Sequence, residues 1–139
     1  MRSPWSISFL IAGTLCLASG ADRRAWQPSA GSAEETQSIN VTAKKYEFEP
    51  ATIRVKQGTR VQLKITATDH AHGFKVSESD AQGKPGLVFS AAQDCTKIEE
   101  GKTETIEFVA QTPGTYPFRC CVHCGWHHRA MKGEIVVEP

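Results

Sequence analysis

The sequence predicts a single all-β domain, either a sandwich or a barrel. From Ser38 onward, apolar and polar residues alternate with a period of two, which places one face of a strand against a core. Short turn signals containing Gly or Pro separate these runs. No convincing amphipathic helix interrupts them, and a chain of 139 residues suits one domain.

The strand candidates, in chain order, cover residues 39–43, 53–55, 61–67, 105–108, 115–119 and 135–137. The run 61–67 is the clearest, because Val61, Leu63 and Ile65 alternate with polar residues. The segment 77–97 is weakly patterned. We expect a long loop there, with a helical turn and one short apolar run at 87–89.

The N-terminus is typical of a targeting segment. Arg2 is the only charged residue before Asp22, an apolar run lies between them, and small residues at 19–21 suit a signal peptidase site. The run is short for a membrane span. We expect a signal peptide at 1–21. If it is not cleaved, the same segment would act as an N-terminal membrane anchor.

Two further segments follow from this boundary. Residues 22–37 are polar and without periodicity, which favours a flexible linker, and 38–139 form the folded domain. We expect an exported, periplasmic or otherwise extracytoplasmic protein whose mature chain has no membrane span. Such a compartment allows disulfides to persist.

Charge argues against two classes of partner. The chain has 16 basic and 15 acidic residues, which gives a net charge of +1. A protein so close to neutrality is not expected to bind nucleic acid or an anionic membrane surface.

The strongest functional signal lies between the last two strand candidates. Cys120, Cys124, His128 and Met131 follow one another at short intervals on one loop. Thiolate and thioether select copper, imidazole accepts it, and Met is the usual weak axial ligand in copper electron-transfer sites. A structural zinc site rarely recruits Met. The loop therefore predicts a redox-active copper site.

A further imidazole is available upstream, directly after the strand candidate 61–67. His72, followed by Gly73, is our first choice, and His70 is the competitor two residues away. Two roles remain open for Asp69: it forms a hydrogen bond near such a site, or it is an ordinary surface carboxylate.

Residues 39–137 resemble a cupredoxin domain. The resemblance rests on the opening VTAKKYEFEP with IRVKQG, and on PGTY leading into Cys120. It implies a Greek-key β-sandwich. Within that family, the C-x3-C-x3-H-x2-M loop with an upstream His-Gly-Phe is similar to the binuclear Cu-A centre of cytochrome c oxidase subunit II and nitrous oxide reductase.

The Cu-A resemblance implies two copper ions bridged by two thiolates. Carried onto this chain, the ligands are His72, Cys120, the Val122 carbonyl, Cys124, His128 and Met131. It implies single-electron transfer with a c-type cytochrome or an oxidase subunit as partner. The chain lacks the two membrane helices and the propeller domain that accompany such domains, so we expect no catalysis by the chain itself.

Two other functions remain open. A mononuclear blue-copper carrier would use one copper ion, held by His72, Cys124, His128 and Met131. A copper-binding or delivery protein would use Cys121, His123 and His127 as transient ligands. Our own expectation is that His70, His123 and His127 face solvent or support the metal ligands.

The remaining side chains also leave alternatives. In one alternative, Cys120 and Cys124 form a disulfide. In another alternative, Cys121 and Cys124 act as a redox dithiol. Sequence does not decide whether Cys120 or Cys121 is the first thiolate, nor whether Cys95 pairs with Cys121. For Trp126 we favour packing over the loop rather than a docking role.

Overall fold

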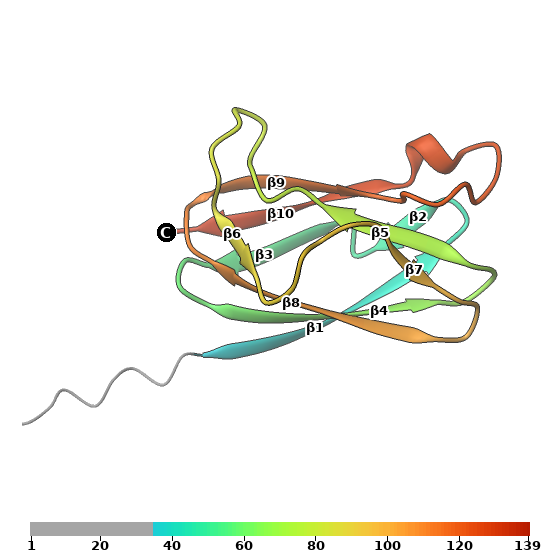
Figure 1. The fold of residues 1–139 in the computed structure, drawn as a ribbon, viewed down its shortest axis with the longest axis horizontal. Coiled ribbons are helices and arrows are strands. Elements are labelled where there is room, and N and C mark those ends of the chain that lie inside the picture. The colour runs from blue at the N-terminus through green and yellow to red at the C-terminus, as the bar shows by residue number, and fades with distance from the viewer. Residues whose placement is uncertain (1–34) are drawn as a thin grey trace, which may run out of the picture.

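The computed structural model describes residues 35–139, which form two five-stranded β-sheets packed face to face (Figure 1). The strands are β1 (Thr36–Lys44), β2 (Glu47–Glu49), β3 (Thr52–Lys56), β4 (Arg60–Ala67), β5 (His72–Val76), β6 (Leu87–Phe89), β7 (Thr96–Ile98), β8 (Thr103–Ala110), β9 (Gly114–Arg119) and β10 (Lys132–Glu138). One short 3-10 helix, η1 (His128–Ala130), lies between β9 and β10. The predicted all-β sandwich, a single domain, is confirmed.

The first sheet has the strand order β2-β1-β4-β8-β6. In its central strand β4, every second side chain faces the other sheet. Val61, Leu63, Ile65 and Ala67 are therefore buried, while the residues between them are not. β1 runs parallel to β4, and β8 runs antiparallel to it. The chain crosses to the other sheet through β3 before it returns to β4.

The second sheet has the order β3-β10-β9-β5-β7 and positions the predicted metal loop. β9 and β10 are antiparallel neighbours, so the loop 120–131 starts and finishes at the same end of the sandwich. β5 pairs with the other side of β9, through Lys75 opposite Arg119 and Val76 opposite Phe118. The start of β5 therefore extends past the end of β9 and lies beside the first residues of the metal loop, at the right-hand end of Figure 1.

An aromatic cluster fills the core beneath this end. The rings of Phe48, Phe74 and Phe118 lie 4.9–5.4 Å apart between centroids, and all three side chains are buried. Phe74 is two residues from His72, and Phe118 is two residues from Cys120. Because residues two apart on a strand share a face, His72 and Cys120 point toward the same interior as these phenylalanines.

The strand candidates all fall within observed strands, but β2, β5 and β7 were missed. β5 lacks alternation, since four of its five residues are buried. In 77–97, the run 87–89 is indeed a strand, whereas the expected helical turn is wrong: the one helical turn of residues 35–139 is η1. The predicted signal peptide and nearly all of the linker lie outside the described residues, and β1 begins at Thr36. Within 35–139, no helix is long and apolar enough to cross a membrane.

Candidate metal centre

The metal loop is closed at its base by the two strands that flank it. Along β9, Tyr116 and Phe118 point inward, and Cys120 continues this alternation one residue beyond the strand. The Cys120 amide donates to the Met131 carbonyl at 2.9 Å, just before β10 begins. This bond brings the first and last predicted ligands of the loop together, although they are eleven residues apart in sequence.

Three sulfur atoms gather at the inner side of the loop. Cys120 Sγ lies 3.4 Å from Cys124 Sγ, and Cys124 Sγ lies 3.9 Å from Met131 Sδ. The three side chains are 2%, 5% and 0% exposed. Both cysteines are free thiols, so the alternative of a Cys120–Cys124 disulfide is wrong for this structure. Soft ligands that converge away from water match the preferences of copper.

His72 reaches the same interior from the first position of β5 and is fully buried. Its Nε2 lies 2.7 Å from Asp69 Oδ1, while its Nδ1 has no hydrogen-bond partner. A carboxylate accepts from Nε2–H, which assigns the proton to that nitrogen and leaves the Nδ1 lone pair available. An imidazole supported in this way is the usual arrangement for a metal ligand.

Gly73 lets the His72 segment approach the metal loop. A Cβ on Gly73 would lie 2.6 Å from the Val122 amide nitrogen and 2.7 Å from Cys121 Sγ, closer than real side chains come. The Gly73 amide donates to Cys120 Sγ at 3.4 Å. The close packing of these two segments explains why a glycine directly follows His72.

His128 lies at the start of η1. Its Nδ1 is buried and has no hydrogen-bond partner. The ligand atoms of Cys120, Cys124 and His128 all lie within 4.8 Å of one another, which suits a shared metal. The Val122 carbonyl oxygen lies 3.2 Å from Cys120 Sγ and accepts a hydrogen bond from that thiol. All six predicted ligands therefore converge on one region.

His70, the competitor of His72, also lies at this site. Its Nε2 donates to the Cys124 carbonyl at 2.8 Å, and its ring centroid is 4.2 Å from that of His72. Its Nδ1 lies 3.0 Å from Asp69 Oδ1, although not in hydrogen-bonding geometry. The ligand atoms of His70, His72 and Cys124 form a second possible metal-binding group. Sequence reasoning did not foresee that His70 ties the upstream segment to the cysteine loop.

Asp69 is the charged group that organises the upstream segment. Burial alone would raise the pKa of its carboxyl, but hydrogen bonds from His72 and the Lys45 amide, with the nearby His70, lower that pKa to about 2. The carboxylate therefore stays ionised at any ordinary pH. Burial, with the neighbouring Cys120 thiol, raises the pKa of Cys124 to about 11. Metal binding must consequently displace a proton from Cys124.

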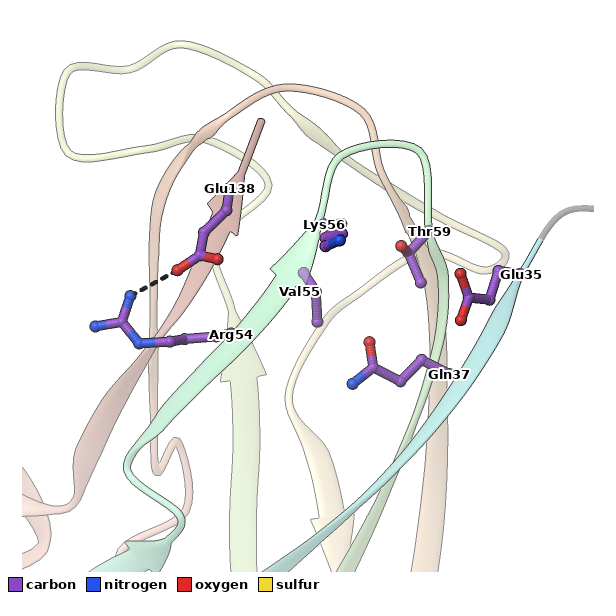
Figure 2. Close-up of a pocket in the computed structure, with 7 residues that line it drawn as sticks. All are labelled: Glu35, Gln37, Arg54, Val55, Lys56, Thr59 and Glu138. Carbon is purple, nitrogen blue, oxygen red and sulfur yellow. Dashed lines mark hydrogen bonds and ion pairs between the residues drawn. The ribbon is translucent and has the colours of Figure 1, made fainter.

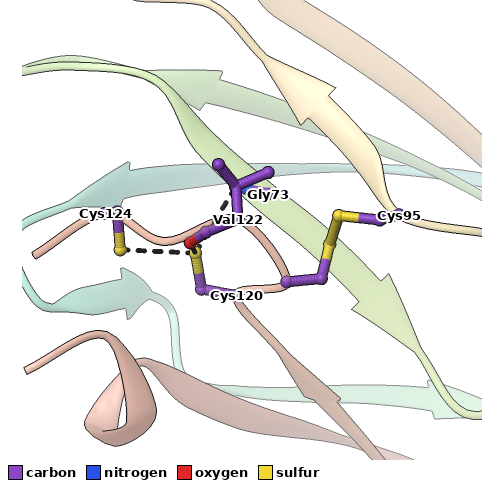
Figure 3. Close-up of a disulfide and its surroundings, with 6 residues drawn as sticks. Gly73, Cys95, Cys120, Val122 and Cys124 are labelled. Atoms are coloured by element: carbon purple, nitrogen blue, oxygen red, sulfur yellow. Dashed lines mark hydrogen bonds between the residues drawn. A yellow bond between two sulfur atoms is a disulfide. The ribbon is translucent and has the colours of Figure 1, made fainter.

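A disulfide joins Cys121 to Cys95, with the two Cα atoms 5.7 Å apart (Figure 3). It ties the metal loop to the segment between β6 and β7. Cys121 is thus not free to serve as the first thiolate, and the proposed redox dithiol of Cys121 and Cys124 is wrong. Figure 3 shows the free thiols of Cys120 and Cys124 beside the disulfide, linked by a dashed line.

The other aromatic residues of the loop lie at its outer side. Trp126 is 98% exposed, so the expectation that it packs over the loop is wrong. The His127 ring contacts Tyr46 edge to face, with centroids 5.1 Å apart, and the His123 ring lies 5.6 Å from that of His128.

A cavity of about 450 Å³ lies at the opposite end of the sandwich, where Arg54 pairs with Glu138 (Figure 2). Its other lining residues are Glu35, Gln37, Val55, Lys56 and Thr59. None of them is a cysteine or a histidine. The chemistry expected for this chain therefore belongs to the cysteine loop and not to this cavity.

Comparisons with known proteins concern the fold and the family of this chain. Residues 8–137 match the family model of the cupredoxin-like domain. The chain is 29% identical over 100 residues to cytochrome c oxidase subunit 2 of Thermus thermophilus, which covers 72% of the chain and 64% of that protein. The chain is also 29% identical over 100 residues to cytochrome c oxidase subunit 2 of a second Thermus thermophilus sequence, strain ATCC 27634, and this match covers 52% of that protein. The chain thus spans between half and two thirds of the length of these relatives.

Solved structures share the fold. A heme-copper terminal oxidase dimer superposes with a TM-score of 0.58 at 20% identity, over 78% of this chain and 68% of that one. The periplasmic domain of subunit II of the Bradyrhizobium japonicum cytochrome oxidase gives 0.56 at 16% identity, over 73% and 83%. Auracyanin B gives 0.55 at 18% identity, over 74% and 89%. At these identities the likeness concerns the fold alone.

Proposed function

Because this chain belongs to the cupredoxin-like domain family, we propose that it holds a Cu-A-like binuclear copper centre and transfers single electrons. The relatives named cytochrome c oxidase subunit 2 support this choice within the family. The chain itself would bind and hold the metal and would catalyse no reaction.

One observation carries the proposal. Two buried free thiols lie 3.4 Å apart, and the buried Nδ1 atoms of His72 and His128 lack any partner within the described residues. Leaving a buried polar atom unsatisfied costs about 1–3 kcal/mol. Two such nitrogens beside a thiol pair are explained together if all four atoms bind metal.

Each residue then has a distinct task. Cys120 and Cys124 would hold the two ions as thiolates, His72 and His128 would hold them through their imidazoles, and Met131 and the Val122 carbonyl would complete the set. Copper held by these residues would supply a one-electron couple. The Gly73–Cys120 hydrogen bond and the Asp69–His72 pair hold the ligands in place, so little movement is needed between oxidation states.

We further propose where the domain works and with which partners. A cleaved signal at 1–21 and a linker at 22–37 would deliver residues 38–139 to an extracytoplasmic compartment. The periplasmic subunit II domain among the structural neighbours supports that location. A c-type cytochrome, or the other subunits of an oxidase, would then exchange electrons with it.

The test is an electron paramagnetic resonance spectrum of the copper-loaded domain, with copper per protein measured on the same sample. We expect two copper ions per chain and one unpaired electron coupled to both nuclei. A single ion with a one-nucleus hyperfine pattern would reject the binuclear centre.

A mononuclear centre is the second candidate, and the position of His70 favours it. His70, His72 and Cys124 can hold one ion without Cys120, since their ligand atoms lie within 4.8 Å of one another. Replacing Cys120 by Ser separates the two candidates. The binuclear centre predicts loss of the coupled signal, whereas the mononuclear one predicts an unchanged spectrum.

A further inference from the structure

A row of basic side chains crosses the outer face of the second sheet at the ligand end. Arg119 on β9 stands directly opposite Lys75 on β5 and directly opposite Lys132 on β10. Arg129, in η1, lines a common cavity with Arg119. We call Lys75, Arg119, Arg129 and Lys132 the cation row.

The cation row is not neutralised within the folded domain. None of its four side chains forms an ion pair or a side-chain hydrogen bond with any of residues 35–139, whereas Lys44, Arg54 and Lys97 pair with carboxylates. Glu134, the carboxylate two residues beyond Lys132, contacts Thr52 instead. Like charges directly opposite one another in a sheet are destabilising, so the row carries an electrostatic cost in the folded domain.

The cation row lies directly over the predicted ligands. Arg119 precedes Cys120, Arg129 follows His128, and Lys132 follows Met131. On a strand, neighbouring residues point to opposite faces, so the buried sulfur of Cys120 lies beneath the exposed guanidinium of Arg119. A cavity of about 360 Å³, lined by Arg119, Cys120, His128 and Arg129, leads from the row to these ligands.

We infer that the cation row is the docking surface for a redox partner protein with an acidic surface patch. The inference rests on the proposed electron-transfer function and adds the charge of the partner. A partner seated on the row would stand over the cavity and close to Cys120 and His128. Opposite charges on two surfaces speed association and fix orientation, both of which electron exchange needs.

An acidic protein fits the row better than an anionic membrane does. The molecule as a whole carries a net charge of only +1, so its summed field gives little attraction to an extended anionic surface. The four cations are instead gathered at one site, next to the ligands. A local patch of this kind complements a patch on another protein.

The test measures association of the copper-loaded protein with two soluble c-type cytochromes, one strongly acidic and one strongly basic. Isothermal titration calorimetry gives Kd, and stopped-flow gives the electron-transfer rate. The variant Lys75→Glu/Lys132→Glu reverses two charges of the row. Its matched control, Lys64→Glu/Lys102→Glu, makes the same change in net charge at exposed lysines of β4 and of the turn before β8.

We expect the acidic cytochrome to bind more tightly than the basic one. The row variant should weaken that binding about tenfold or more at low salt, and the control should have little effect. The difference should vanish as ionic strength rises from about 0.01 M to about 1 M, because the screening length falls from roughly 30 Å to roughly 3 Å.

Three results would overturn the inference: tighter binding of the basic cytochrome, equal weakening by the control, or association with phosphatidylglycerol vesicles that the row variant abolishes while the acidic cytochrome does not bind. Binding that follows the row without any electron transfer would instead reject the proposed function. The two failures are thus distinguishable.

Discussion

The two ends of the sandwich differ in how their polar groups are satisfied. At the end that holds the β3–β4 turn and the C-terminus, polar groups pair with one another: Arg54 with Glu138 at 2.9 Å, and Gln57 Nε2 with the Gln111 carbonyl at 2.8 Å. At the ligand end, the buried Nδ1 atoms of His70, His72 and His128 form no hydrogen bond within the described residues, and the four cations of the row form no ion pair there.

This difference shows which end needs something from outside. The first end is complete as folded, although it contains the larger cavity, because its charged groups face water or one another. The metal and the acidic partner surface that we propose would satisfy the ligand end from inside and from outside. On this proposal, unsatisfied polar groups and not cavity size mark the functional end of the molecule.

The largest effect is expected from Cys124→Ser. Cys124 belongs to both possible metal-binding groups, so no arrangement of the remaining ligands replaces it. We expect complete loss of the coloured copper site in the absorption spectrum, together with loss of any gain in Tm on adding copper. A copper-loaded Cys124→Ser protein with the wild-type spectrum would contradict the assignment of the site.

A smaller effect is expected from Asp69→Ala. This change removes the carboxylate that fixes the His72 imidazole through Nε2. Loss of such a supporting group typically lowers metal affinity about 10–100-fold. Competition with a copper chelator measures the change. Asp69→Asn is the matched control and should lose less, since its Oδ1 still accepts from Nε2–H. Equal affinity in all three proteins would contradict a role for Asp69.

The disulfide should matter for stability more than for the metal. Cys95 and Cys121 are 26 residues apart, and closing a loop of that size stabilises a fold by roughly 3 kcal/mol. We expect Cys95→Ser/Cys121→Ser to lose about this much free energy of unfolding in urea, while its copper spectrum keeps the wild-type form. A lost or single-nucleus copper signal in this variant would mean that Cys121 or its bond shapes the centre directly.

Particular residues show how far sequence could lead. The alternation of Val61, Leu63 and Ile65 predicted β4 correctly, because burial on one face leaves a pattern in the chain. The six predicted ligands also converge in space, because their spacing reflects one loop and one neighbouring strand. Their role as copper ligands remains a prediction that metal binding must test.

Other features are set by contacts that leave no local pattern. The pairing of Cys95 with Cys121 depends on where the β6–β7 connection passes the metal loop, which spacing does not reveal. β5 lacks alternation because both of its faces are covered. The cation row is invisible in the net charge, since it forms only when three strands align Lys75, Arg119 and Lys132.

The smallest effect is expected at the opposite end, from Arg54→Gln. This change breaks the ion pair with Glu138 beside the cavity of Figure 2. The two side chains are 65% and 47% exposed, so water already screens the pair, and such surface pairs contribute at most about 1 kcal/mol. We expect a change in the free energy of unfolding within that bound, and copper affinity equal to that of the wild type. A fall in copper affinity as large as that of Asp69→Ala would show that the two ends are coupled. It would contradict the distinction between an end whose polar groups pair with one another and an end whose groups require a ligand.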